Sequence, residues 1–209
     1  KKGCERVIRY AFELARFRPQ GAPMDGKKRV TCIDKSNVLK ACVFWREIFN
    51  KVAENYPDIE KDYAYIDAWT QWAVRRPEWY NVCVVTNMFG DIITDLAAAI
   101  QGGLGLAPSL QVGDELAMAE PVHGSAPKYY GKKVTNPMAA ILSAMWLMRY
   151  FHQKYGDKAA AEAAARIEAA VVEVLKEGKV LTYDLGGSAH TDEVGDEIAK
   201  KIKTVQVTV

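Results

Sequence analysis

The segment Asn87-Met88-Phe89-Gly90-Asp91-Ile92-Ile93-Thr94-Asp95-Leu96 predicts the end of a strand that runs into a helix. The β-branched run Val82-Cys83-Val84-Val85 before it is typical of a buried strand, and Gly102-Gly103 after it predicts the end of the helix. Asp91 and Asp95 are four residues apart, so a helix places their carboxylates on one face. Such neighbours repel each other, and a hard divalent cation such as Mg²⁺ or Mn²⁺ relieves that repulsion through oxygen ligands. The alternative is that the helix dipole favours Asp91 and that Asp95 is a solvated surface charge.

The composition of the 209 residues, 49% apolar and 26% charged, is ordinary for a globular protein. The net charge of +2 argues against a strongly basic nucleic-acid surface. We recognise no signal peptide and no apolar run that could span a bilayer, so we expect a cytoplasmic protein with no membrane and no nucleic acid as a partner. The cysteines form no CxxC pair, and we expect four buried free thiols of a reducing compartment: Cys4, Cys32, Cys42 and Cys83.

Helix and strand patterns precede the opening segment. An amphipathic helix is expected to end near Pro19, and the run Arg29–Asp34 predicts a strand. That strand places Lys35 and Asn37 at its carboxyl end, where open α/β sheets bind their ligands. This edge is therefore where we expect chemistry.

A long helix is expected next, from Asn37 to about Asn55, with five inward apolar residues: Leu39, Val43, Ile48, Phe49 and Val52. The run Asp62–Tyr65 predicts a short strand that leads to Asp67. A further helix is expected to stop before Pro77.

After the opening segment, the glycine-rich bend Gly102–Pro108 is a candidate hinge between two domains. Residues 118–131 are interpreted as a loop rich in hydrogen-bonding groups. Three helices are expected beyond it, over about 138–151, over about 158–176 with Gly178 as a C-cap, and from about Thr191.

Each candidate residue also has an ordinary explanation. Lys35 alone is a solvated lysine, although beside acidic metal ligands a lysine can act as a general acid or base. Asp67 alone is a helix N-cap. His123 is a turn or core histidine, or part of a loop whose ring and backbone N–H groups hold a nucleotide; Lys128 is by default a surface charge. The remaining aromatic candidates are interpreted as packing residues: Trp69, Trp72 and Trp79.

Six motifs stand in collinear order: Asp34-Lys35-Ser36-Asn37-Val38, Asn87–Asp95, Gly102–Pro108, Glu120-Pro121-Val122-His123-Gly124-Ser125-Ala126-Pro127, Asn136-Pro137 and Asp184-Leu185-Gly186-Gly187. Together they resemble the β-decarboxylating dehydrogenases of the isocitrate and 3-isopropylmalate dehydrogenase family, over essentially the whole chain. The resemblance implies a two-domain α/β fold like that of isopropylmalate dehydrogenase. Residues 1–101 would be part of the central substrate and dimerisation domain, and residues 102–209 the C-terminal part of the nucleotide-binding domain. It also implies that an N-terminal part is missing from this chain, with the family's substrate-clamping arginines and catalytic tyrosine.

The implied reaction is the metal-dependent oxidation of a 2-hydroxy acid with a 3-carboxylate, followed by loss of CO₂, in a homodimer with shared active sites. By this resemblance Asp91 and Asp95 bind Mg²⁺ or Mn²⁺ together with the partner subunit's Asp67. The metal would hold the hydroxyl and α-carboxylate of the substrate and stabilise the developing enolate. Lys35 resembles the catalytic lysine that acts in proton transfer from the hydroxyl, so Lys35 and Asp67 are the expected catalytic residues.

The resemblance also implies a nicotinamide cofactor, with Asn37 near its nicotinamide end. Its adenosine part is expected to contact His123, Gly124, Ser125, Ala126, Lys128, Tyr129 and Asn136, with Tyr183 nearby. NAD-dependent members usually carry an aspartate where this chain has Lys128, and a cation there favours the 2′-phosphate of NADP. However, Gly187 replaces an arginine that NADP-dependent isocitrate dehydrogenases are expected to carry after Tyr183. NAD and NADP both stay open, with NADP favoured.

Two features favour 3-isopropylmalate, and hence leucine biosynthesis. Trp45-Arg46 resembles a pair in 3-isopropylmalate dehydrogenases, and the apolar Val38 suits a branched alkyl substrate. Isocitrate with NADP, homoisocitrate and tartrate remain alternatives, because such relatives share the other motifs. A different class of function is a non-catalytic regulatory subunit. Such subunits tend to lose the metal carboxylates or the lysine, and this chain retains all four residues: Lys35, Asp67, Asp91 and Asp95.

Overall fold

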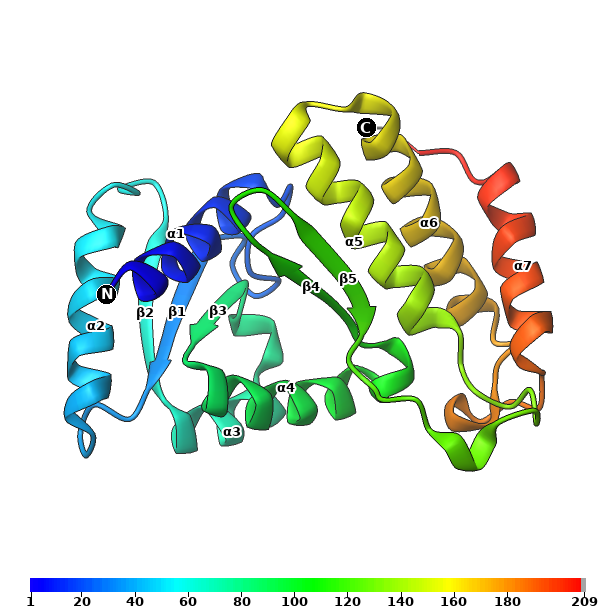
Figure 1. Ribbon diagram of the computed structural model, residues 1–209, viewed down its shortest axis with the longest axis horizontal. Coiled ribbons are helices and arrows are strands. Elements are labelled where there is room, and N and C mark those ends of the chain that lie inside the picture. Colours follow the sequence, from blue (N-terminus) through cyan, green and yellow to red (C-terminus); the bar gives the residue numbers. More distant parts are fainter. Residues whose placement is uncertain (208–209) are drawn as a thin grey trace. The chain divides into compact units, whose positions relative to one another are not determined.

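The computed structural model describes residues 1–207, which form two compact units that divide between Ala97 and Ala98. The first unit has a parallel three-stranded sheet of order β2-β1-β3 (Figure 1). Its strands are β1 (Arg29–Asp34), β2 (Glu60–Tyr65) and β3 (Val82–Val85). Its helices are α1 (Lys2–Phe17), α2 (Lys40–Ala53), α3 (Ile66–Arg75) and the first part of α4 (Asn87–Gln101).

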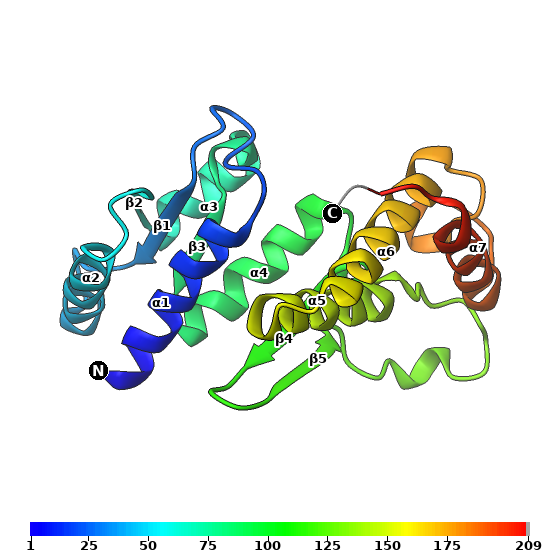
Figure 2. The same ribbon diagram turned by 90° about the horizontal axis from the view of Figure 1, so that it is seen from above.

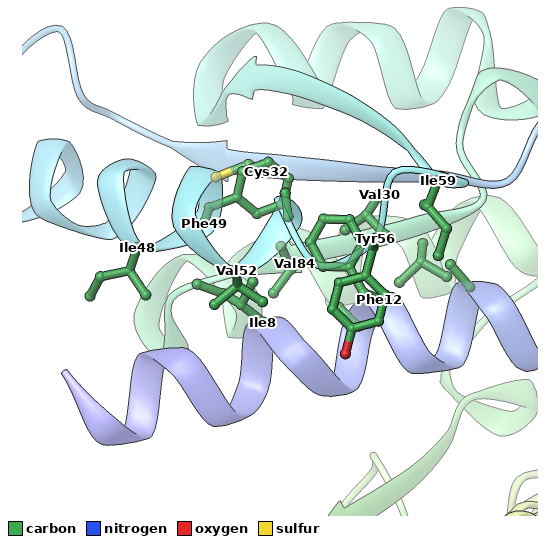
Figure 3. Packing of buried hydrophobic residues seen from close by; sticks show 14 of the residues in the cluster. Ile8, Phe12, Val30, Cys32, Ile48, Phe49, Val52, Tyr56, Ile59 and Val84 are labelled. Carbon is green, nitrogen blue, oxygen red and sulfur yellow. The ribbon is translucent and has the colours of Figure 1, made fainter.

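Helices cover both faces of this sheet. Because side chains alternate along each strand, apolar residues form a core on each face. Val30 and Cys32 of β1 pack against α1 and α2, in a cluster that includes Phe12 and Phe49 (Figure 3). On the opposite face Ile33 packs with residues of α3 and α4, namely Trp69, Ala73 and Ile93. Every residue of β1 is consequently buried, as expected for a central parallel strand.

The predicted strands at 29–34 and 82–85 are confirmed, but the start of α2 differs from the prediction. The helix begins at Lys40, because the backbone N–H groups of Val38 and Leu39 donate to the carbonyl of Lys35 and form a turn. Leu39 and Val43 are 42% and 41% exposed, so the prediction that they face inward is wrong. The buried stripe of α2 instead comprises Cys42, Trp45, Ile48, Phe49, Val52 and Ala53.

The second unit begins at Ala98 and contains an antiparallel hairpin and three helices. The hairpin strands are β4 (Pro108–Val112) and β5 (Ala117–Pro121), and the helices are α5 (Met138–Tyr155), α6 (Lys158–Glu177) and α7 (Thr191–Thr204). Helix α5 packs on the hairpin and against α6, and α6 packs against α7 (Figure 2). Gly178 has a φ of 65° and ends α6 as predicted.

Strand β5 corrects the interpretation of residues 118–131 as a loop. Its sequence contains alanine, glutamate and proline, which have little preference for strands. The pairing with β4 and the contact with α5 therefore create this strand, and neither is visible in the local sequence.

The bend at residues 102–108 packs within the second unit. Leu106 is 5% exposed and belongs to a core cluster with Met138, Val171 and Val194. Gly103, with a φ of 118°, has backbone torsions that L side chains rarely adopt. The glycines therefore allow the turn by which the chain leaves α4 and places Leu106 in this core.

All four cysteines are free. Cys32 and Cys42 are buried as expected, whereas Cys4 and Cys83 are partly exposed, so the expectation is wrong for the latter two. Among residues 1–207, no helix combines the length and apolar character that a membrane crossing requires.

Candidate active site

Lys35 and Asp67 meet at the carboxyl end of the first sheet. Lys35 follows β1 directly, and Asp67 lies in the first turn of α3, which follows β2 without a gap. Parallel pairing places Asp34 beside Tyr65 and so brings the two strand ends together. The ammonium nitrogen of Lys35 then lies 2.6 Å from Asp67 Oδ1.

This ion pair is open to solvent on the side of Asp67, whose side chain is 67% exposed, against 24% for Lys35. The hydrogen bond from Lys35 holds the pKa of Asp67 below its usual range, and backbone N–H groups add to this effect. Tyr65, not Asp67, is the N-cap of α3. The pair therefore presents a carboxylate that stays ionised and a lysine with a fixed partner.

Asp91 and Asp95 lie on the exposed side of α4, while Ile93 between them is buried in the core. In residues 1–207 neither carboxylate has a hydrogen-bond or ion-pair partner. Two unpartnered carboxylates four residues apart suit a hard divalent cation, which takes oxygen ligands. They supply only part of such a site, because no group of three or more His, Cys, Asp or Glu residues is placed for a metal in that part of the chain.

Asp34 and Arg46 are functional candidates that the sequence analysis did not connect. Asp34 is fully buried, and the guanidinium of Arg46 binds both of its oxygens, at 2.7 and 2.9 Å. The signal was available, because an acidic residue at the end of a fully buried strand requires a cation nearby. Trp45 is 3% exposed and lies in the core cluster, so Trp45-Arg46 has a structural part in this chain.

Asn37 and Val38 lie in the turn between β1 and α2, close in sequence to Lys35. Both are exposed, Val38 by 68%. They are therefore accessible to a ligand at the carboxyl end of the sheet.

The segment from His123 to Lys128 in the second unit is exposed throughout. The ring of His123 is hydrogen-bonded to the carbonyl of Gly124, with Nδ1 and oxygen 2.9 Å apart. Ala126 adopts a left-handed conformation with a φ of 44°, directly before a short 3₁₀ turn at Pro127–Tyr129. This turn presents Ser125 and its neighbours to solvent, as a ligand-binding loop requires.

Lys128, Tyr129 and Tyr183 form a cluster beside this loop. The rings of Tyr129 and Tyr183 have centroids 6.2 Å apart, and the ammonium of Lys128 lies 4.8 Å from the centre of the Tyr129 ring. A hydrogen bond from Tyr183 and the proximity of Lys128 lower the pKa of Tyr129, while the same contact raises the pKa of Tyr183. The cluster combines a cation with two phenols, which suits an anionic group.

Asn136 is 8% exposed and its side chain is engaged within the protein. Its Nδ2 donates to Asp184 at 3.1 Å, and its Oδ1 accepts from the backbone of Met138 at 2.9 Å. A Cβ at Gly105 would lie 2.8 Å from Asp184 and 2.9 Å from Asn136. Asn136 thus ties the start of α5 to the segment that carries Asp184, close to Gly105.

A model of the family described as isocitrate/isopropylmalate dehydrogenase matches residues 1–198 of this chain. The chain belongs to this family. The matched range contains every candidate site residue of both units.

Relatives in this family carry different substrate names. The chain is 46% identical over 204 residues to a protein named 3-isopropylmalate/3-methylmalate dehydrogenase from Methanocaldococcus jannaschii, covering 97% of this chain and 58% of that one. It is 42% identical to an isocitrate dehydrogenase [NADP] from Thermus thermophilus, covering 96% of this chain and 38% of the relative. The homoisocitrate dehydrogenase of M. jannaschii is 44% identical, with coverage of 97% and 54%. The chain therefore spans about 38% to 58% of the length of these curated relatives.

Solved structures show the same family likeness. The TT0538 protein from Thermus thermophilus superposes with a TM-score of 0.83 at 43% identity, over 98% of this chain and 39% of that one. A β-decarboxylating dehydrogenase from Thermococcus kodakarensis gives a TM-score of 0.81 at 37% identity, over 97% and 55% of the two chains. The expected family and α/β fold are thus confirmed.

Proposed function

We propose that the protein containing this chain is an NAD(P)- and divalent-metal-dependent dehydrogenase that oxidises and decarboxylates a 3-carboxy-2-hydroxy acid. The observation that carries the proposal is the Lys35–Asp67 pair at the carboxyl end of a parallel sheet, 2.6 Å apart, in a member of this family. The unpartnered carboxylates of Asp91 and Asp95 support the metal requirement. Residues 1–101 then belong to the substrate and dimerisation domain and residues 102–209 to the nucleotide-binding domain of a cytoplasmic enzyme.

In this mechanism Lys35, as its neutral amine, would accept the proton of the substrate hydroxyl as the hydride of the C–H bond leaves. Asp67 accepts a hydrogen bond from Lys35 Nζ at 2.6 Å and would stabilise the ammonium that results. Asp91 and Asp95 would hold the divalent metal through their carboxylate oxygens, and the metal would supply the positive charge that attracts the hydroxyl and α-carboxylate of the substrate. When bound, Mg²⁺ or Mn²⁺ supplies a Lewis acid and the nicotinamide supplies a hydride acceptor.

A homodimer with shared sites explains the distribution of the carboxylates. Within residues 1–207, Asp67 is paired with Lys35, and no group of three potential ligands is assembled. We therefore assign Asp91 and Asp95 to one protomer's metal and the third carboxylate to the partner subunit's Asp67. In this arrangement Lys35 and Asp67 of one protomer act together in the site that holds Asp91 and Asp95 of the other protomer.

Mixed dimers test this arrangement. Asp67→Ala and Asp95→Ala homodimers of the full-length protein are expected to be inactive. Subunit exchange between them restores one intact site per mixed dimer, or roughly a quarter of wild-type activity for random pairing in a C₂ dimer. A mixture that stays inactive although mixed dimers form would contradict the shared site.

The substrate we favour is 3-isopropylmalate, in leucine biosynthesis. Val38 supports it, because an apolar side chain that is 68% exposed close to Lys35 can contact a branched alkyl group. Similar relatives are also named for isocitrate and homoisocitrate at comparable identity, so these two acids are alternatives. Tartrate is a further alternative from the shared motifs. The test is nicotinamide reduction by the full-length protein with Mn²⁺ and each acid in turn. Faster turnover of isocitrate than of 3-isopropylmalate would reject the favoured substrate.

For the cofactor we favour NADP over NAD. The cation of Lys128 beside Tyr129 and Tyr183 supports this choice, because the three side chains can bind a phosphate monoester where an aspartate would repel it. The adenosine part would contact the exposed loop from His123 to Ala126 and Asn136. Measuring kcat/KM for both cofactors decides between them, and a preference for NAD would contradict the proposal.

The alternative of another class is a regulatory subunit that keeps the fold without turnover. The presence of Lys35, Asp67, Asp91 and Asp95 argues against it, since each has a chemical part in the reaction. Calorimetric titration of the full-length dimer with Mn²⁺ separates the two possibilities. An enzyme binds the metal and loses that affinity in Asp95→Asn, whereas absence of both metal binding and turnover would favour the regulatory subunit.

A further inference from the structure

The carboxyl end of β1 carries an ion pair, Asp34–Arg46, to which the proposed mechanism assigns no step. Asp34, the last residue of β1, has no exposed surface. Its Oδ2 accepts from Arg46 Nε at 2.7 Å, and its Oδ1 accepts from Arg46 Nη2 at 2.9 Å. A two-point contact of this kind fixes both the separation and the relative orientation of two planar groups. The first half of α2 is thereby tied to the end of β1.

The same carboxylate also fixes the backbone that carries Lys35. The backbone N–H of Ser36 donates to Asp34 Oδ1 at 2.8 Å, which closes an Asx turn around Lys35. On the other side, the carbonyl of Lys35 accepts from the backbone N–H of Leu39 at 2.9 Å. The main chain of Lys35 is consequently held from both directions.

An aromatic ring lies beside both cations. The ring centre of Tyr65 is 5.4 Å from the guanidinium carbon of Arg46 and 5.8 Å from the ammonium of Lys35. Tyr63 lies 5.2 Å from the same guanidinium. Arg46 therefore contacts Tyr65, the ring that also lies beside Lys35, in addition to fixing the backbone of Lys35 through Asp34.

Stability alone does not account for this pair. Burying the carboxylate of Asp34 beside an Arg46 side chain that is 27% exposed costs desolvation free energy that apolar side chains of similar volume do not lose, so such a pair is weak evidence for stability. Apolar packing cannot provide the three directed hydrogen bonds that Asp34 accepts at this turn, two from Arg46 and one from the backbone of Ser36. This turn is the one that presents Lys35 to Asp67.

We propose that Arg46 and Asp34 are positioning residues for Lys35, because their contact fixes the turn between β1 and α2 and so holds the lysine ammonium at Asp67. The inference rests on the catalytic role that the proposed function gives to Lys35. Neither Arg46 nor Asp34 touches substrate or cofactor in this arrangement, and both act through the backbone.

The test uses the full-length protein and four variants: Arg46→Met, Arg46→Lys, Asp34→Asn and Arg16→Met. Arg16→Met is the matched control, because Arg16 makes a similar two-point contact with Asp58, at 2.6 and 3.2 Å, on the surface of the same unit. The first measurement needs no turnover. It is the rate at which acetic anhydride acylates Lys35 at one pH, followed by peptide mass spectrometry. The second measurement is kcat and KM with the preferred substrate and cofactor.

We expect acylation of Lys35 to become severalfold faster in Arg46→Met and Asp34→Asn, and to stay unchanged in Arg16→Met. We expect kcat to fall by about 10²-fold with little change in the KM for the cofactor, since small misplacements of a reacting group have effects of that size. Arg46→Lys, which keeps the charge without the two-point contact, should recover part of kcat.

The inference is overturned if the acylation rate of Lys35 and kcat both stay at their wild-type values in Arg46→Met and in Asp34→Asn. If the wild-type protein turns over none of the substrates, the proposed function fails, while the acylation rates still decide whether Arg46 and Asp34 position Lys35. If Arg46→Met does not fold, the comparison of Asp34→Asn and Arg46→Lys with Arg16→Met decides in the same way.

Discussion

The two regions that carry the candidate site are built in opposite ways. At the carboxyl end of the first sheet, Lys35 rests on a buried framework in which Asp34 has no exposed surface and its partner side chain is 27% exposed. The loop of the second unit exposes every residue from His123 to Lys128, and its contacts are short-range. The residue proposed for catalysis is thus fixed by the core, whereas the residues proposed for cofactor binding lie on an exposed loop.

The largest effect is expected from Lys35→Met. We expect kcat to fall by about 10²–10⁴-fold, the range that positioned acid–base groups supply. The protein should remain folded, because the side chain is no part of a core cluster. Steady-state kinetics and circular dichroism measure the two quantities. Lys128→Met is the contrasting variant from the loop, and we expect it to raise the KM for NADP with a smaller change in kcat. Equal effects of both variants on kcat would erase the distinction between the regions.

Arg29→Met tests the buried framework of the first unit. The fully buried guanidinium of Arg29 contacts Asp25 at 2.6 Å and Glu60 at 2.8 Å, and lies 3.7 Å from the ring centre of Trp79. Its loss leaves Asp25 without its ion-pair partner and Glu60 with Lys27 alone, so we expect the free energy of unfolding to fall by about 3–5 kcal/mol. Chemical denaturation measures this change. Arg16→Met, at a surface pair, should leave stability nearly unchanged, and equal losses would contradict the contrast between buried and surface pairs.

Lys128→Asp tests whether Lys128 determines the proposed preference for NADP over NAD. An aspartate there repels the 2′-phosphate and accepts hydrogen bonds from the ribose hydroxyls, so we expect the ratio of kcat/KM for NADP over NAD to fall about 10–100-fold, since hydrogen bonds to charged groups are worth ~1.5–3 kcal/mol. Kinetics with each cofactor measures the ratio. Lys132→Asp nearby is the control for charge alone, and a matching fall in that variant would reject a specific contact.

The smallest effect is expected at the ion pair between Lys133, which follows the loop, and Asp192 of α7. Lys133 lies 2.6 Å from Asp192, and this contact holds the pKa of Asp192 below its ordinary value of 3.8. A lowered pKa in the folded state adds stability above the ordinary value, and this contribution is lost as pH falls through the lowered pKa. Lys133→Met should therefore bring the pKa of Asp192 back toward 3.8. The accompanying loss of stability should be present at neutral pH, vanish at acid pH, and be small because the pair is exposed. Carboxyl NMR titration measures the shift, and an unmoved pKa would show that Lys133 is not its cause.

Much of the fold follows from local sequence. The runs Val30–Ile33 and Val82–Val85 are continuously β-branched or apolar, and Gly178 ends α6 because it tolerates a positive φ. The start of α2 could not be predicted in the same way. It depends on the buried Asp34, which captures the backbone N–H of Ser36 and delays the helix until Lys40. Strand β5 escaped prediction because its partner β4 and its neighbour α5 create it.

The sequence by itself determined the family, the candidate site residues and the pairing of Asp91 with Asp95 on one helical face, because these depend on residue identity and spacing. Only the tertiary structure showed that Lys35 meets Asp67 across 32 residues of chain. It also showed that Arg46 binds Asp34 and that Asn136 is committed to Asp184. The physical reason is that parallel strands bring their carboxyl ends together regardless of separation in sequence, and that a buried charge selects its partner by position in space.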